Sequence, residues 1–223
     1  MPKSTTQRIR QLTIFPRGGA RRGSGRKPKG ERALVTHVVR PRLTERDPVL
    51  VTTRLLPDLP NLRREGTLAT LRRVLSAGSD RFGFRLVEFS IQTNHLHLIA
   101  EAEDARSLAR GMQGLLVRVA KALNKDWGRR GKVLADRYHA RILGTPTEVR
   151  RALVYVLQNA RKHGARITGI DAFSSGPWFR GWRDRIARAG SPIASARSWL
   201  LASGWRRGGL LATSEVPASA PSG

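Results

Sequence analysis

The sequence contains no cysteine and little acidic charge. Without cysteine it can form neither disulfides nor thiolate metal sites. Asp and Glu number 16 against 42 Lys and Arg, which gives a formal net charge of +26. This positive excess repels itself unless an anion is bound. Nucleic acid is the expected partner, with an anionic membrane surface as the rival.

Long apolar runs are also missing. No stretch of about 18 apolar residues is present to cross a bilayer, and no apolar core of a signal peptide is evident. We therefore expect a protein that is not embedded in a membrane. The lack of cysteine fits a reducing cytoplasm, although any compartment tolerates a cysteine-free chain.

The length of 223 residues predicts one ordinary domain with extensions. Residues 1–33 are rich in Gly, Arg and Lys and predict a disordered basic arm that contacts phosphates without sequence preference. Its segment Gly25-Arg26-Lys27-Pro28 is close to the Gly-Arg-Pro core of AT-hooks, so minor-groove binding is an alternative. The other predicted segments are a domain over 34–165, an aromatic and basic extension over 166–213 and a disordered tail over 214–223. The aromatic residues of 173–182 either pack this segment onto the domain or stack unpaired bases.

Strand and helix patterns alternate along the predicted domain. Phe84–Ala102 predicts two strands joined by a turn near Gln92-Thr93-Asn94. Asp104 is the expected N-cap of a long helix that ends near Trp127. A later helix begins at Pro146, with Thr145 and Glu148 as a capping box. The alternation predicts an α+β fold in which helices pack on one face of an antiparallel sheet.

Two histidines occur at the start of the second of these strands. Because strand side chains alternate between faces, His95 and His97 point the same way, about 7 Å apart along the strand. Two imidazoles in this arrangement can bind one divalent cation. The alternative is a pair of histidines on a half-exposed strand, so the metal interpretation needs further ligands.

The helix that begins at Pro146 carries a tyrosine outside its apolar stripe. Tyr155 lies roughly 140° from the centre of that stripe, so core packing does not explain it. Asn159 follows at i+4 on the same face, and Arg151 and Lys162 flank that face. Taken alone, this pattern fits a surface tyrosine beside an amide equally well.

Three ordered motifs together resemble a known family: Asn94-His95-Leu96-His97-Leu98, Asp136-Arg137-Tyr138-His139 and Tyr155-Val156-Leu157-Gln158-Asn159. They are similar to motifs of the single-tyrosine HUH transposases, named for their His-hydrophobic-His strand, and above all of the REP-associated tyrosine transposases. The resemblance covers about residues 34 to 165. It implies a ferredoxin-like core, a metal site formed by His95, His97 and Asn159, and Tyr155 as the nucleophile.

The resemblance also implies an activity. A protein of this family cuts and rejoins single-stranded DNA, with hairpin or palindromic repeats as substrate, through a 5′-phosphotyrosine intermediate. Imidazole and amide-oxygen ligands favour Mg²⁺ or Mn²⁺. We further expect a monomer or homodimer in the bacterial cytoplasm, associated with the nucleoid. A non-catalytic, domesticated nucleic-acid-binding protein of the same fold is the alternative.

Basic residues in the arm, in the turn before the Asp136 motif and around the tyrosine helix are the expected DNA contacts. They are Arg21, Arg22, Arg26, Lys27, Lys29, Arg129, Arg130, Lys132, Arg137, Arg151 and Lys162.

Overall fold

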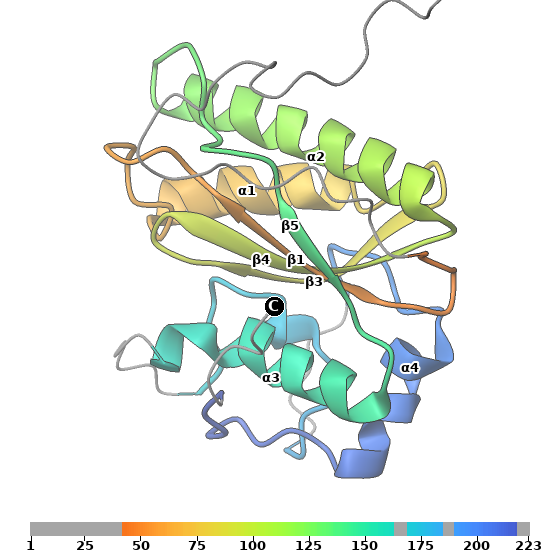
Figure 1. Cartoon of the computed structure of the whole chain (residues 1–223). Helices are drawn as coiled ribbons and strands as arrows, with labels where there is room; N and C mark the ends of the chain where they lie inside the picture. The colour runs from red at the N-terminus through yellow and green to blue at the C-terminus, as the bar shows by residue number, and fades with distance from the viewer. Residues whose placement is uncertain (1–41, 163–168, 185–189, 218–223) are drawn as a thin grey trace, which may run out of the picture. The chain divides into compact units, whose positions relative to one another are not determined.

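The computed structural model describes residues 42–162, 169–184 and 190–217, and a five-stranded sheet lies at their centre (Figure 1). The strand order is β2-β3-β4-β1-β5, and every neighbouring pair is antiparallel. The strands are β1 (Val49–Arg54), β2 (Asp80–Arg81), β3 (Phe84–Ile91), β4 (His95–Ala102) and β5 (His139–Ile142). Apart from the short edge strand β2, this is the ferredoxin-like order that the resemblance implied. The predicted α+β class and antiparallel sheet are confirmed.

The helices connect and follow these strands. They are α1 (Glu65–Ala77), α2 (Ala105–Asp126), α3 (Pro146–Lys162) and α4 (Trp199–Ala202), with 3₁₀ turns at Gly176–Trp178 and Gly204–Gly208. The expected caps are present: the Asp104 carboxylate accepts from the Ser107 N–H, and the Thr145 hydroxyl accepts from the Glu148 N–H. No helix in the described ranges combines the length and hydropathy needed to span a membrane.

Helices α1 and α2 cover one face of the sheet and bury the even-numbered apolar residues of β4. Gly111 of α2 sits directly against Phe84 of β3, where an added Cβ would lie 2.2 Å from the Phe84 ring. Only a residue without a side chain permits this approach of helix to strand.

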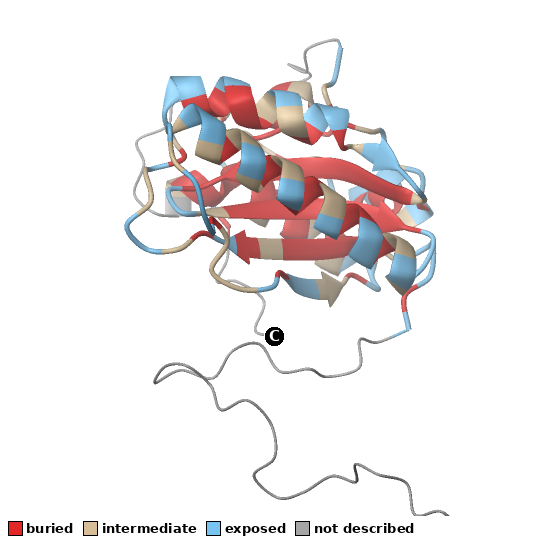
Figure 2. Ribbon diagram, turned by 90° about the horizontal axis from the view of Figure 1, so that it is seen from above, coloured by how far each residue is buried: buried red, intermediate tan, exposed pale blue. Residues whose placement is uncertain are grey.

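Helix α3 lies on the opposite face (Figure 1). The prediction that helices pack on one face therefore holds for α1 and α2 and is wrong for α3. The physical reason is that β3 and β4 carry apolar residues on both sides, and Figure 2 shows both strands buried along nearly their whole length. A sheet of this kind needs a second layer of cover.

The C-terminal residues complete this second layer. Phe179, Trp182 and Trp205 are buried in the cluster formed by α3 and the sheet, so these aromatic side chains pack onto the domain. The Gln158 amide donates to the carbonyl groups of Ala212 and Thr213. Arg150 forms an ion pair with Glu215, so ordered chain continues past residue 214, where the sequence predicted a disordered tail.

Candidate active site

His95 and His97 begin β4 and point to the face covered by α3, whereas Leu96 and Leu98 enter the core beneath α1 and α2. The two imidazoles meet edge to face, with their Nε2 atoms 3.0 Å apart. His97 is buried and His95 is half-buried. The alternation of the strand therefore brings both side chains into one polar corner.

Helix α3 brings Tyr155 to the same corner. The Tyr155 Oη lies 3.3 Å from His97 Nε2, and the ring is half-buried. Asn159, one helical turn further on, is completely buried. Within the described part of the chain neither its Oδ1 nor its Nδ2 has a partner at hydrogen-bonding geometry, although the amide is close enough to Tyr155 to affect its pKa. His95, His97, Tyr155 and Asn159 thus lie on one side of the sheet.

The outer nitrogens of both imidazoles have partners that the sequence analysis missed. His95 Nδ1 lies 2.9 Å from the Asn94 Oδ1, and His97 Nδ1 lies 3.0 Å from the Thr52 Oγ1. An amide oxygen only accepts, so His95 carries its proton on Nδ1 and directs a lone pair from Nε2. The Thr52 hydroxyl can donate or accept. When it accepts from His97 Nδ1, the Nε2 atoms of both rings offer lone pairs to a shared ion.

The register of β1 against β4 brings Thr52 opposite His97 and Arg54 opposite His95. Strand alternation in Val49–Arg54 was a usable signal that Thr52 and Arg54 share a face. The pairing with β4 is a long-range property that no local pattern reveals.

Burial raises the pKa of the Tyr155 phenol above its ordinary value, while the neighbouring Asn159 amide and the charge of Arg54 lower it in part. The phenol is therefore protonated at neutral pH in the protein alone. The two cations that flank this face in the sequence are Arg151 and Lys162, and the described Arg151 is not among the causes of this shift. Arg151 is exposed on α3, and Lys162 is the last residue of α3, with a side chain outside the described set.

The corner fits a divalent cation with oxygen and nitrogen ligands. Adjacent corners of an octahedron with ligand distances of about 2.1 Å are about 3.0 Å apart, and the two imidazole Nε2 atoms are separated by 3.0 Å. The buried Asn159 amide supplies an oxygen that has no other hydrogen-bond partner in the described ranges. The described residues contain no cluster of three or more His, Cys, Asp or Glu, so any ion here would depend on the two imidazoles and the amide.

The basic residues predicted to contact DNA divide into three sets. Arg129 and Lys132 already bind carbonyl groups of their own turn. Arg130, Arg137 and Arg151 are exposed. The third set is not described, and it comprises the Lys162 side chain and the arm residues Arg21, Arg22, Arg26, Lys27 and Lys29.

No model of a known protein family matches the sequence, and no curated protein matches it. Among solved structures, a REP-associated tyrosine transposase bound to a REP hairpin is similar, with a TM-score of 0.53 and 14% identity, over 73% of this chain and 96% of that one. A proposed transposase from Deinococcus radiodurans R1 matches with 14% identity over 54% of this chain and 92% of that one, but its TM-score of 0.36 is too low to support a common fold. The first likeness establishes the fold of the described domain.

Proposed function

We propose that this protein is a transposase that cuts and rejoins single-stranded DNA through Tyr155, with a divalent cation held by His95, His97 and Asn159. One observation carries the proposal: the Tyr155 hydroxyl lies 3.3 Å from His97 Nε2, which in turn lies 3.0 Å from His95 Nε2. A structural tyrosine on a covered sheet face would have no need of two convergent imidazoles. The likeness in fold to a transposase bound to a DNA hairpin supports the same conclusion.

The reaction exchanges one phosphodiester bond for another. The Tyr155 oxygen attacks a backbone phosphorus, a bond from Oη to phosphorus forms, and the bond to the 3′-oxygen breaks. The phenol loses its proton, and the departing 3′-oxygen gains one. A 3′-hydroxyl that attacks the phosphotyrosine reverses the step, so rejoining requires no nucleotide cofactor.

Each residue of the corner has a part in this step. Asn94 and Thr52 orient the imidazoles, and Arg54 brings a positive charge toward Tyr155 that favours the phenolate. Because Asn159 and Tyr155 share α3, a rigid helix determines the position of the nucleophile relative to the ligand amide. A bound Mg²⁺ or Mn²⁺ would supply charge neutralisation and orientation of the phosphate.

Single-stranded hairpin DNA is the proposed substrate. The net charge of +26 supports a polyanionic partner. Arg130 and Arg137 present exposed cations in the connection that precedes β5. We propose that these residues and the basic arm contact phosphates on either side of the cleaved position.

The test is formation of a covalent protein–DNA adduct. Labelled single-stranded hairpins built from inverted repeats beside the gene are incubated with the protein and Mn²⁺, then separated under denaturing conditions. We expect a shifted band from the wild type, none from Tyr155→Phe, and an undiminished band from Tyr138→Phe, which changes the only other tyrosine. A band of full strength from Tyr155→Phe would show that the nucleophile is misassigned. Tight binding without an adduct on any hairpin would favour the non-catalytic alternative.

A further inference from the structure

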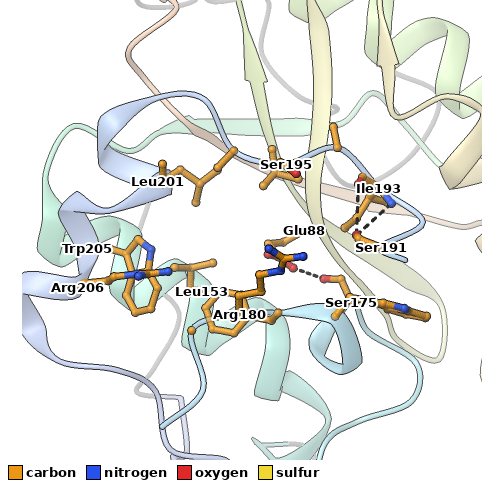
Figure 3. Close-up of a pocket in the computed structure, with 17 residues that line it drawn as sticks. Glu88, Leu153, Ser175, Arg180, Ser191, Ile193, Ser195, Leu201, Trp205 and Arg206 are labelled. Atoms are coloured by element: carbon orange, nitrogen blue, oxygen red, sulfur yellow. Dashed lines mark hydrogen bonds between the residues drawn. The ribbon is translucent and has the colours of Figure 1, made fainter. Parts of the chain in front are cut away.

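A second polar site lies on the same sheet face as the tyrosine. It is a cavity of about 250 Å³ between β3, α3 and the C-terminal residues. Figure 3 shows Glu88 and Ser175 on one side of the cavity, Trp205 with Arg206 on the other, and Arg180 close to Glu88. Apolar residues such as Leu153 and Leu201 line the remainder. The proposed cleavage chemistry uses none of these groups.

A β-bulge turns Glu88 toward this cavity. The register of β3 against β4 shifts between Leu86 and Glu88, so two successive residues, Val87 and Glu88, occupy the face that alternation would give to one. The Glu88 side chain is only 8% exposed, and its Oε2 is hydrogen-bonded to the Ser175 hydroxyl. Ser175 in turn accepts from the Phe89 N–H. The carboxyl is thus held in one orientation.

The remainder of the lining is suited to a nucleotide. Trp178, which is half-buried and lines the cavity, offers aromatic surface of the kind on which bases stack. Arg180 and Arg206 are exposed and carry the only charges besides Glu88 among the described lining residues, so they can bind phosphate at the entrance. Glu88 pairs with Ile99, two residues along β4 from His97, so one DNA strand can reach both sites.

We propose that this cavity binds one unpaired base of the DNA strand, with Glu88 reading the edge of the base and Arg180 and Arg206 holding the adjacent phosphates. The proposal rests on the proposed function only in taking DNA as the ligand. It adds a contact with a base, made between β3 and the C-terminal extension, to a protein whose other expected contacts are phosphates.

The protonation of Glu88 determines how its carboxyl can pair with a base. Burial raises the pKa of Glu88 to about 8, against a smaller opposing effect of the Ser175 hydrogen bond. At pH 7 the carboxyl is mainly neutral and offers one donor and one acceptor. Adenine and cytosine present the matching pair, an amino group beside a ring nitrogen. Thymine presents an N–H beside a carbonyl group, which a neutral carboxyl matches equally well, so Glu88 detects the pairing edge of a base without distinguishing among the bases.

Binding of fluorescent dT20, and of the same strand with every thymine methylated at N3, to the full-length protein at pH 7 without divalent metal tests the proposal. We expect dT20 to bind at least about fivefold more tightly than the methylated strand, whose bases still stack but cannot donate from N3; this is the lower end of discrimination by a paired base contact. Glu88→Gln should keep this preference because its amide has the same donor and acceptor. Glu88→Leu has a similar size and no polar group, so its affinities should become equal, and its melting temperature reports whether it folds.

A pH series keeps the test decisive if Glu88→Leu does not fold. At pH 9 the wild-type carboxyl is ionised and can no longer donate to the base, so its preference should weaken, while Glu88→Gln should keep it. Two results would contradict the proposal that Glu88 pairs with a base in this cavity. One is equal affinity of the wild type for the two strands at pH 7, and the other is a preference that persists in a folded Glu88→Leu protein. The binding test measures no cleavage, so its outcome is independent of the adduct experiment. A base preference without any covalent adduct would support base binding in the cavity and argue against the proposed transposase activity. An adduct without a preference would do the reverse.

Discussion

Leu96 and His97 are neighbours on β4, yet they lie in opposite surroundings. Leu96 enters a core in which β1, β3 and β4 pack against α1 and α2. His97 points toward α3, where its ring contacts His95, Tyr155 and Thr52. The same strands therefore contribute to the apolar core with one face and to the polar corner with the other.

Buried polar groups are unevenly divided between the faces. Beneath α1 and α2, the hydroxyls of Thr67 and Thr70 donate to Asp126 and join the two helices. The Thr53 hydroxyl, on the same face as Leu96, has no hydrogen-bond partner among the described residues. The α3 face holds Glu88 with a raised pKa and the Asn159 amide, neither polar atom of which has a hydrogen-bond partner within the described part of the chain. Buried groups of this kind cost stability. The comparison teaches that the apolar face stabilises a frame on which the other face can hold reactive groups.

The largest expected effect is a loss of activity caused by a substitution on the α3 face. His97→Ala removes the imidazole closest to Tyr155, and adduct formation should fall nearly to background. Loss of a group that merely supports a metal ligand already reduces affinity or activity about 10–100-fold. Added Mn²⁺ should restore only part of the rate. The melting temperature should change little, because the imidazole is not part of the apolar core. A His97→Ala protein with the wild-type rate would show that the imidazole pair is not needed for the reaction.

The opposite face should respond in the opposite way. Leu71 of α1 is fully buried, and Leu71→Ala should lower the free energy of unfolding by about 2–5 kcal/mol, measured by urea denaturation. The rate of adduct formation per folded molecule at low temperature should stay within about twofold of the wild type. A large loss of rate with an intact fold would show that the two faces are coupled. It would contradict the view that one face stabilises the fold and the other carries the reactive groups.

Local patterns predicted much of this arrangement. Alternation gave His95 and His97 a common face, and the caps at Asp104 and Thr145 marked where helices begin. These signals involve residues within four positions of one another. The structure brings the predicted corner together, and the roles of its residues await the adduct experiment.

The features that were missed depend on long-range contacts. Thr52 meets His97 only through the register of β1 against β4, which lies 45 residues away along the chain. Glu88 reaches the α3 face through a bulge, so simple alternation misplaces it. The face that α3 covers follows from its connection to β5 and from strands that are apolar on both sides, and neither is visible in the helix's own periodicity.

The effect expected for a single pH step is the smallest, at most about 1.4 kcal/mol per pH unit, and it concerns Glu88 and the contrast in polarity between the faces. The ordinary pKa of this carboxyl is 4.5, and burial raises it to about 8 in the folded protein. Between these values the folded state binds more protons than the unfolded state, so stability falls as pH rises. The contribution is fully present below about pH 4.5 and is lost as pH passes about 8.

Other ionisable groups also affect stability, so the measurement is a difference between two proteins. Glu88→Gln keeps the size and hydrogen bonding of the side chain but cannot ionise. Urea denaturation of both proteins at pH 5, 6, 7 and 8 should show the wild type losing stability relative to Glu88→Gln at each step. Arg180 and Arg206, the charged groups that line the cavity beside Glu88, are unchanged in both proteins. Parallel stability curves would mean that Glu88 is ionised in the folded state, and the α3 face would then hold a buried charge in place of a neutral hydrogen-bonding group.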